Sequence, residues 1–277
     1  MNKDKLTALC HKIAKEKEVP FNVTMTYYFL EQILQKISAS SYREQFIFKG
    51  GFLLSNMIGV TSRTTTDMDF IIQQLQMERD VLVAALEEIL QDDRITYTIA
   101  KVTDIKDEDP YGGYRISVLC QLDNIRMTIP LDIATGDPIT PKSVQYHYQS
   151  LFTTGHYPIL AYNVETILAE KLETIYRRSF FNSRSKDFYD VYILSRLEAD
   201  AIDVVKLKQA CQNTFAYRHT PFDLIAFEQL LVELQESSTL QNHWTNYQKH
   251  YDYAKGIAFH EVLSACELLV RKIAVEL

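Results

Sequence analysis

The chain has 277 residues, which is enough for one large domain or two small ones. Hydrophobic residues make up 47% of it and aromatic residues 12%, so it can bury a core, and only 8 glycines and 7 prolines argue against long disordered linkers. The net charge of −7 counts against a protein that coats nucleic acid through bulk positive charge, although it is compatible with a local basic patch.

Neither a membrane anchor nor a secretory signal is indicated. No stretch of about 18 uncharged apolar residues occurs, and the polar segment Met1–Lys5 lacks the apolar stretch of a signal peptide. The four cysteines are far apart and match no zinc spacing; they are Cys10, Cys120, Cys211 and Cys266. We therefore expect reduced core thiols in a cytoplasmic protein that has no membrane partner.

The first half of the chain alternates between helical and strand periodicity. The patterns predict helices over Lys3–Lys17, Val23–Ile37, Phe52–Met57 and Met77–Gln91, and strands over Phe46–Phe48, Met68–Ile72, Ile95–Val102, Tyr114–Leu122 and Ile125–Ile133. The pair Asp123-Asn124, between the last two strands, favours a two-residue hairpin turn because both residues tolerate a positive φ.

From Ala161 onward the periodicity is almost entirely helical, and the last helices are expected over Ala201–Phe215, Phe222–Glu236 and Gln241–Ala274. The stretch Pro138–His156 separates the two patterns, because two prolines and a glycine interrupt it. The expected fold class is therefore α+β, with a mixed-sheet domain over residues 1–155 followed by an all-helical bundle over residues 156–277.

A glycine pair and an Asp-x-Asp segment carry the chemical signal. Gly50-Gly51 ends an apolar run, and Asp67 and Asp69 open the next predicted strand after a helix-sized segment. Strand side chains repeat with period two, so these carboxylates project from one face and repel each other unless a cation lies between them. Mg²⁺ takes such positions and also binds substrate phosphates, and glycine backbone can approach a phosphate closely. Together they suggest a metal-dependent nucleotide site.

Two longer motifs resemble the signature of the AbiEii/AbiGii toxin family. They are Lys49-Gly50-Gly51-Phe52-Leu53-Leu54 and Arg63-Thr64-Thr65-Thr66-Asp67-Met68-Asp69-Phe70. That family belongs to the DNA polymerase β-like nucleotidyltransferase superfamily, and the resemblance runs over nearly the whole chain. It implies an N-terminal nucleotidyltransferase core with a mixed β-sheet and a C-terminal helical bundle.

A third carboxylate, Asp132, interrupts the apolar run Ile129–Ala134. Members of the superfamily carry a third carboxylate on a strand next to the Asp-x-Asp strand. By resemblance, Asp132 completes a site for Mg²⁺, or for Mn²⁺ in its place, with Asp67 and Asp69. It would also help to remove the proton from the attacking hydroxyl. The alternative is that Asp132 only ends a strand and caps the turn that follows.

The resemblance places the nucleotide phosphates on the glycine pair. Many superfamily members have Gly-Ser where this chain has Gly50-Gly51, and the serine hydroxyl binds the phosphates. Here backbone N–H groups must do this, with help from Ser55 or from the hydroxyls of Thr64 to Thr66. The change leaves the nucleotide preference open.

Three more residues are assigned to the nucleotide site by the resemblance, namely Lys49, Arg63 and Thr65. Arg63 is expected either to orient phosphates or to pair with the Asp-x-Asp carboxylates, since a forked guanidinium suits both. The alternative is a loop arginine at the surface.

In the helical half, Lys171 falls on the core-facing stripe of a predicted amphipathic helix, together with Val164, Leu168 and Ile175. A lysine in that position is costly unless its ammonium reaches an anion or a cleft. The family has a similar Glu-x-x-x-Ala-x-Lys helix, whose lysine is taken to contact the nucleotide triphosphate. The alternative is a lysine that extends along an apolar stem to solvent.

The segment Arg184-Ser185-Lys186-Asp187-Phe188-Tyr189-Asp190 resembles the family's Arg-x-Lys-Asp-x-x-Asp motif. Ser185 is a possible N-cap, and Asp187 suits the positive end of a helix dipole. Asp190 stands among apolar residues and needs a buried partner, for which Lys171 is the natural one. A structural bridge and a catalytic pair predict the same geometry; the family treats this aspartate as essential.

Two clusters in the helical half admit more than one interpretation. The basic cluster is Lys171, Arg177, Arg178, Arg184 and Lys186. It is either a nucleic-acid patch or a solvated helix face. The aromatic cluster is His243, Trp244, Tyr247, His250, Tyr251 and Tyr253. Such clusters are usually core or a partner interface, and stacking on unpaired bases is the alternative.

The resemblance implies the toxin of a toxin–antitoxin pair that acts in abortive infection and phage defence. The expected reaction is transfer of nucleotides from an NTP to an RNA acceptor, the 3′ end of a tRNA, and the expected partner is an antitoxin from a neighbouring gene. Two alternatives stay open. One is nucleotidylation of a protein side chain by the same carboxylates, and the other is a toxin that binds a nucleotide without turnover.

Overall fold

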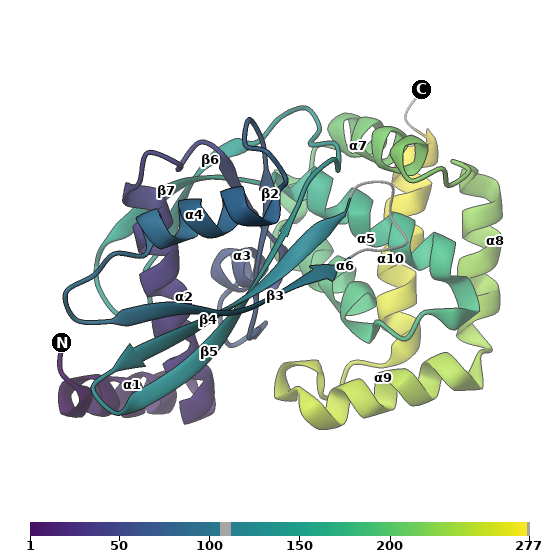
Figure 1. Cartoon of the computed structure of the whole chain (residues 1–277). Coiled ribbons are helices and arrows are strands. Elements are labelled where there is room, and N and C mark those ends of the chain that lie inside the picture. The colour runs from purple at the N-terminus through teal and green to yellow at the C-terminus, as the bar shows by residue number, and fades with distance from the viewer. Residues whose placement is uncertain (106–111, 276–277) are drawn as a thin grey trace. The chain divides into compact units, whose positions relative to one another are not determined.

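The computed structural model of the protein describes residues 1–105 and 112–275. They form two units (Figure 1). The sheet unit contains Met1–Gly136 and Ser143–Ala161, and the helical unit contains Asp137–Lys142 and the described residues from Tyr162 onward. This division differs from the expected one at residue 155: a strand after that point joins the sheet, and a short segment before it joins the helices.

The sheet unit begins with two helices and then alternates strands with helices. Its elements are α1 (Lys3–Lys17), α2 (Phe21–Ala39), β1 (Phe46–Lys49), α3 (Gly50–Ile58), β2 (Met68–Ile72), α4 (Arg79–Ile89), β3 (Thr96–Ile105), β4 (Gly113–Leu122), β5 (Ile125–Ala134), β6 (Val144–Gln149) and β7 (His156–Ala161). Within the described residues the strands form one sheet in the order β3-β4-β5-β2-β1-β7-β6. The sheet is mixed, because β2 runs parallel to β5 and β1 runs parallel to β7 while the other neighbours are antiparallel.

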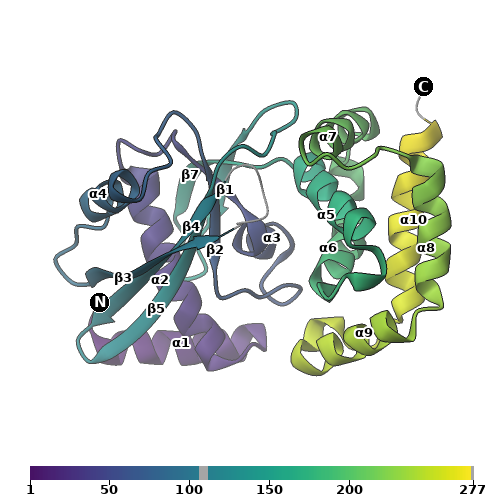
Figure 2. The ribbon, with the colours of Figure 1, turned by 45° about the vertical axis from the view of Figure 1, so that its right-hand side comes forward.

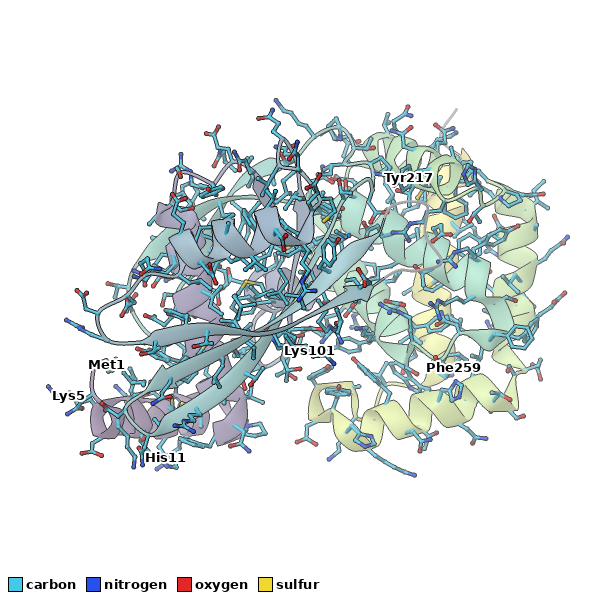
Figure 3. The ribbon with its side chains drawn as sticks, in the orientation of Figure 1. Met1, Lys5, His11, Lys101, Tyr217 and Phe259 are labelled. Atoms are coloured by element: carbon cyan, nitrogen blue, oxygen red, sulfur yellow. The ribbon has the colours of Figure 1, made fainter. Side chains whose placement is uncertain are left out.

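The helices of this unit bury apolar stripes against the sheet. α2 contacts β5 and β7, α4 contacts β3, and α3 contacts β1, β2 and β6. In α1, Leu6, Cys10 and Ile13 are buried, whereas Lys5 and His11 are exposed (Figure 3), and the His11 ring stacks on Phe21 with the ring centroids 4.2 Å apart. An aromatic core lies where β1, β2, α3 and β6 meet, with Phe48 and Phe52 ring centroids 5.6 Å apart.

β6 and β7 were not expected from the sequence, which indicated a loop over most of this stretch. β6 is an edge strand and most of its side chains are exposed, so it lacks the apolar alternation that identifies a half-buried strand. Its buried residue is Tyr148, whose hydroxyl donates to the carboxylate of Glu31 on α2 at 3.1 Å. Ser150 Oγ and Leu151 N donate to the same carboxylate at 2.6 and 2.7 Å. Burial raises the pKa of Glu31 to about 7 even though these hydrogen bonds oppose it.

The helical unit contains α5 (Val164–Arg178), α6 (Ser185–Leu197), α7 (Val204–Tyr217), α8 (Leu224–Gln235), α9 (Ser238–His250) and α10 (Phe259–Val275). Figure 2 shows α8 and α10 lying side by side, with α9 across one end of them. The segment before residue 143 belongs here because Arg218, directly after α7, binds Asp137 at 3.1 Å and Glu173 of α5 at 2.9 Å.

The single helix expected over Gln241–Ala274 is two helices, α9 and α10. α9 ends at His250, because Tyr251 is extended with φ of −131° and ψ of 105°, and Gly256, with φ of 79°, lies later in the connection to α10. Two side chains of α9 hold the connection: Trp244 Nε1 donates to the Ile257 carbonyl at 2.8 Å, and Gln248 Nε2 donates to the Ala254 carbonyl at 2.9 Å.

The cysteines are free and buried, as expected. Burial raises the pKa of each thiol, to about 11 for Cys10. Across the residues that the structure describes, no helix is at once long and apolar enough to cross a membrane.

Candidate active site

Four charged residues are register partners across the middle of the sheet, and we call them the charge row. They are Lys49 of β1, Asp69 of β2, Asp132 of β5 and Arg115 of β4. β2 and β5 run side by side and parallel (Figure 1), so Asp69 and Asp132 lie next to each other. Paired residues on neighbouring strands share one face of a sheet. The row therefore places two adjacent carboxylates between two cations.

Arg115 holds Asp132 in a bidentate ion pair. Its Nε and Nη2 donate to the two carboxylate oxygens of Asp132 at 2.7 and 2.6 Å. The side chain of Asp132 is 17% exposed and that of Arg115 is 46% exposed. The hydrogen bond to Asp132 raises the pKa of Arg115 well above its usual range, and the charges of Asp132, Asp67 and Asp69 add to the effect. Arg115 therefore lies in the field of all three expected metal ligands.

Asp67 lies one residue before β2, in a loop that fixes its side chain. Thr65 Oγ1 donates a short hydrogen bond to Asp67 Oδ1. In β2, Met68 and Phe70 are buried whereas Asp69 is half-buried. The β2 face that carries Asp69 is therefore open only at this carboxylate, because Ile71 on the same face is buried as well.

The glycine pair lies directly against this site. Gly50 has a φ of 75°, and a Cβ built on it would be 1.9 Å from Oδ2 of Asp69. A Cβ on Gly51 would lie 3.0 Å from Oγ1 of Thr65 and 3.4 Å from Nη2 of Arg63. Glycine is therefore required at position 50 by its backbone conformation and by the Asp69 carboxylate.

Buried hydrogen bonds fix the loop that precedes β2. Arg63 is buried, which excludes the surface alternative for this arginine. Its carbonyl accepts a hydrogen bond from Ser55 Oγ at 2.5 Å, and Tyr27 donates its hydroxyl proton to the same Ser55 oxygen at 2.6 Å. Thr65 N in turn donates to the Tyr27 hydroxyl at 3.2 Å. The suggestion that Ser55 helps to bind phosphates is therefore wrong, because its hydroxyl is buried and positions the loop.

The side-chain oxygens of the charge row and of Asp67 are of the chemical type that binds a hard divalent cation. The site offers carboxylate oxygens on neighbouring strand positions, which are the ligands that Mg²⁺ and Mn²⁺ prefer. In the described part of the chain, however, no three His, Cys, Asp or Glu side chains are gathered so that they could hold a metal ion. Arg115 and Thr65 bind Asp132 and Asp67, respectively. The third of the three expected metal ligands is Asp69, which lies between Lys49 and Asp132 in the charge row.

The helical unit contains a second charged cluster, centred on Lys171. Its ammonium lies 2.6 Å from Oδ1 of Asp187 and 3.0 Å from Oδ2 of Asp190, and both carboxylates are buried. Arg184 Nε donates to the other oxygen of Asp187 at 2.7 Å. The predicted pairing of Lys171 with Asp190 is present. Asp187, expected mainly to complement the helix dipole, is a buried partner of the same lysine.

Burial and charge oppose each other in this cluster. Burial lowers the pKa of Lys171, but the charges of Asp187 and Asp190 outweigh it and raise that pKa above its usual value. Burial likewise raises the pKa of Asp187, but the charges of Lys171 and Arg184 outweigh it and lower the pKa to about 2. Lys171 and Asp187 are therefore both charged at neutral pH.

Arg115 was missed in the sequence analysis, although a signal for it exists. Arg115 lies eight residues before Asp123, and Asp132 lies eight residues after Asn124. A two-residue hairpin turn at Asp123-Asn124 makes these positions partners, as the structure has them. Counting out from the predicted turn would have placed an arginine opposite the third carboxylate.

Comparisons with known proteins agree with this architecture. A family model described as "Nucleotidyl transferase AbiEii toxin, Type IV TA system" matches residues 32–265. A crystal structure of a Helicobacter pylori protein, described there as a candidate nucleotidyltransferase, aligns with a TM-score of 0.56 and 14% identity, over 92% of this chain and 96% of that one. The H. pylori protein JHP933 aligns with a TM-score of 0.51 and 14% identity, over 91% and 92% of the two chains. None of the curated proteins matches the chain.

The mixed sheet with its helices therefore has the fold of these neighbours, and the family match defines the protein as a nucleotidyltransferase. The chain belongs to the AbiEii family of nucleotidyltransferase toxins, which act in type IV toxin–antitoxin systems.

Replacing Gly50 by alanine is expected to destabilise the sheet unit by about 1–3 kcal/mol, because the left-handed backbone is unfavourable for alanine and its Cβ would overlap the Asp69 carboxylate. Urea unfolding followed by circular dichroism measures this. The matched control is Gly112→Ala, since a Cβ at Gly112 meets no atom within 4 Å. Equal stability of the two variants would contradict the close approach.

Replacing Arg115 by glutamine is expected to tighten Mn²⁺ binding about two- to fivefold, because a half-exposed cation next to Asp132 opposes a second cation there by under about 1 kcal/mol. Free Mn²⁺, measured by electron paramagnetic resonance without nucleotide, reports the affinity. Arg126→Gln, on an exposed part of the same hairpin, is the matched control. Weaker binding in Arg115→Gln than in this control would show that Arg115 organises the site instead of competing for it.

Replacing Lys171 by methionine is expected to lower the free energy of unfolding by about 3–5 kcal/mol, because Asp187 and Asp190 are left buried without their cation. Lys206→Met removes an exposed lysine paired with Asp203 and is expected to change nothing measurable. Chemical denaturation of both variants tests the comparison, and a stable Lys171→Met protein would rule out a structural bridge.

The same cluster predicts a dependence of stability on pH. The pKa of Asp187 is about 2 in the folded protein and about 3.9 in an unfolded chain. Its contribution is therefore complete above about pH 4 and is lost as the pH falls toward 2. Denaturation of wild type and Asp187→Asn at pH values between these limits measures the loss, which is expected to be smaller in the variant.

Proposed function

We propose that the protein transfers nucleotides from an NTP to an RNA acceptor, the 3′ end of a tRNA, with Mg²⁺, or Mn²⁺ in its place, as the cofactor. The observation that carries this proposal is the parallel register of Asp69 and Asp132 on neighbouring strands, beside the backbone of Gly50. Two adjacent carboxylates, a third one at Asp67 and a glycine backbone suit a nucleotide whose phosphates share a cation with the protein.

In this proposal the three carboxylates share the cation, and Asp132 has a second task. Asp67, Asp69 and Asp132 would hold the cation, which when bound would neutralise charge on the phosphates. Asp132 accepts the proton of the attacking RNA hydroxyl. Each carboxylate oxygen has a second lone pair, so Asp132 can do this while it keeps its hydrogen bonds to Arg115. The hydroxyl oxygen forms a bond to the α-phosphorus, and the bond from that phosphorus to the leaving pyrophosphate breaks.

The remaining assigned residues bind the nucleotide. The backbone N–H groups of Gly50 and Gly51 approach phosphate oxygens, and Lys49 and Arg63 add positive charge. Thr65 holds Asp67 through the short hydrogen bond from its hydroxyl.

Lys171 is proposed to neutralise the triphosphate, with Asp190 as its positioning residue. An ammonium has three N–H donors; one of them is donated to Asp187 Oδ1 at 2.6 Å, and Asp190 Oδ2 lies at ion-pair distance, 3.0 Å. The same carboxylates keep the lysine charged, as its raised pKa indicates.

Membership of a toxin–antitoxin family implies an antitoxin partner. We propose that this antitoxin is encoded by a neighbouring gene, that the toxin acts in the cytoplasm, and that nucleotide transfer serves abortive infection against phage.

The proposal is tested with purified protein, Mg²⁺, each α-³²P-labelled NTP in turn and total tRNA, resolved on a denaturing gel. We expect labelled tRNA with wild type and at least a hundredfold less, on the order of a lost transition-state contact, with Asp69→Asn. Asp80→Asn, an exposed aspartate on α4, is the matched control and should retain activity. Label on a protein band instead of RNA would favour a protein acceptor. Undiminished toxicity of a folded Asp69→Asn variant in cells would contradict a catalytic mode of action.

A further inference from the structure

A pocket of about 380 Å³ lies within the helical unit, between the N-terminal end of α6 and the C-terminal end of α9. We call it the α6–α9 pocket. It joins part of the basic cluster to part of the aromatic cluster: its lining includes Arg184, Lys186, His243, Tyr247, His250 and Tyr251. Among the described residues that line it, none is acidic. In a chain with a net charge of −7, this is a local reversal of sign.

The basic side is fixed in place. Arg184 donates its Nε to the buried Asp187, so its guanidinium is anchored while its side chain stays partly exposed. Lys186 follows in the first turn of α6, where the backbone N–H groups of a helix favour an anion. Two cations and a helix N-terminus therefore meet at one wall of the pocket.

The opposite wall offers polar atoms of histidine. Nδ1 of His250 lies 2.7 Å from the carbonyl of Asn246. Because a carbonyl only accepts, this nitrogen carries the proton and Nε2 is the ring atom left to meet a ligand. Nδ1 of His243 is buried and, in the described part of the chain, has no hydrogen-bond partner.

The pocket also has an aromatic platform. The rings of Tyr247 and Tyr251 lie 4.7 Å apart, and Tyr247 is held by a 3.0 Å hydrogen bond between its hydroxyl and that of Tyr253. Tyr251 is 37% exposed, so it is not a core residue. Just before the pocket, Phe181 is 90% exposed. Exposed aromatic rings interleaved with cations are typical of surfaces that bind single-stranded nucleic acid, since every base has a face that stacks.

We propose that the α6–α9 pocket binds one nucleotide of a single-stranded RNA, with its base stacked on Tyr251 and its phosphate on Arg184 and Lys186. The volume is in the range of small-ligand sites, which begins at about 300 Å³. The choice of RNA over DNA rests on the proposed function, which makes RNA the acceptor. The pocket is built entirely from the helical unit, so its binding is measurable without the reaction.

The test is fluorescence anisotropy of a 5′-fluorescein-labelled single-stranded RNA of 12 nucleotides, a length within the range of about 4–16 nucleotides that single-strand-binding folds cover. The assay contains full-length protein and EDTA, and no NTP. Tyr251→Ala is expected to weaken binding at least about fivefold, and Tyr251→Phe, which keeps a ring, is expected to bind as wild type does. Lys186→Ala is expected to weaken RNA binding. It is also expected to reduce the steepness of the plot of log binding constant against log salt concentration by about 0.7. Lys272→Ala, an exposed lysine on α10, is the matched control.

The following results would overturn the proposal that the α6–α9 pocket binds RNA. Equal RNA affinity of wild type, Tyr251→Ala and Lys186→Ala would overturn the proposal. A second arm uses AMP as competitor: if Tyr251→Ala weakens AMP binding and leaves RNA binding unchanged, the pocket takes a free nucleotide and the RNA assignment falls. A labelled DNA of the same sequence that binds tighter than the RNA would also overturn it. Because the assay contains neither metal nor NTP, loss of nucleotide transfer with intact RNA binding would count against the proposed function alone.

Discussion

The constraint on which the sheet unit depends is the pairing of two carboxylates in parallel register. Asp69 and Asp132 occupy neighbouring positions on β2 and β5, where like charges repel. A cation flanks the carboxylate pair on each side, Lys49 next to Asp69 and Arg115 next to Asp132, and these cations offset the repulsion. Other features follow from the same requirement. Gly50 has no side chain where the Asp69 carboxylate needs the space, and a buried hydrogen-bonded loop sets the position from which β2 begins.

The helical unit also contains a charged cluster, in which the central charge is a cation and its partners are carboxylates. One lysine, Lys171, is held by two buried carboxylates, Asp187 and Asp190, and Arg184 balances the extra negative charge. Charged groups of this kind stay buried only as a set, because removal of one member leaves an uncompensated charge. Arg184 also lines the α6–α9 pocket, so the basic wall of the pocket is anchored by the same network.

Local pattern predicted much of the fold, and its failures have physical causes. The bounds of α1 and β2 agree with the structure, because each has a clear apolar period and a clear end. β6 escaped detection because an edge strand is exposed on most positions, and its single buried residue, Tyr148, leaves no alternation. The break between α9 and α10 was missed because the amphipathic stripe runs on through Gly256, and long-range hydrogen bonds from α9 decide the turn.

By itself, the sequence determined which residues carry charge toward one face of β2, where the glycine pair stands, and which family the motifs resemble. These follow from residue identity and from a period of two or 3.6, which are local properties. The tertiary structure alone decided that Asp187 shares Lys171 with Asp190 and that basic and aromatic residues meet in one pocket. It also placed Asp132 beside Asp69, which the resemblance implied, and Arg115 against Asp132, which the predicted hairpin turn allows. Strand order and helix packing bring together residues far apart in the chain, and no local period encodes those partners.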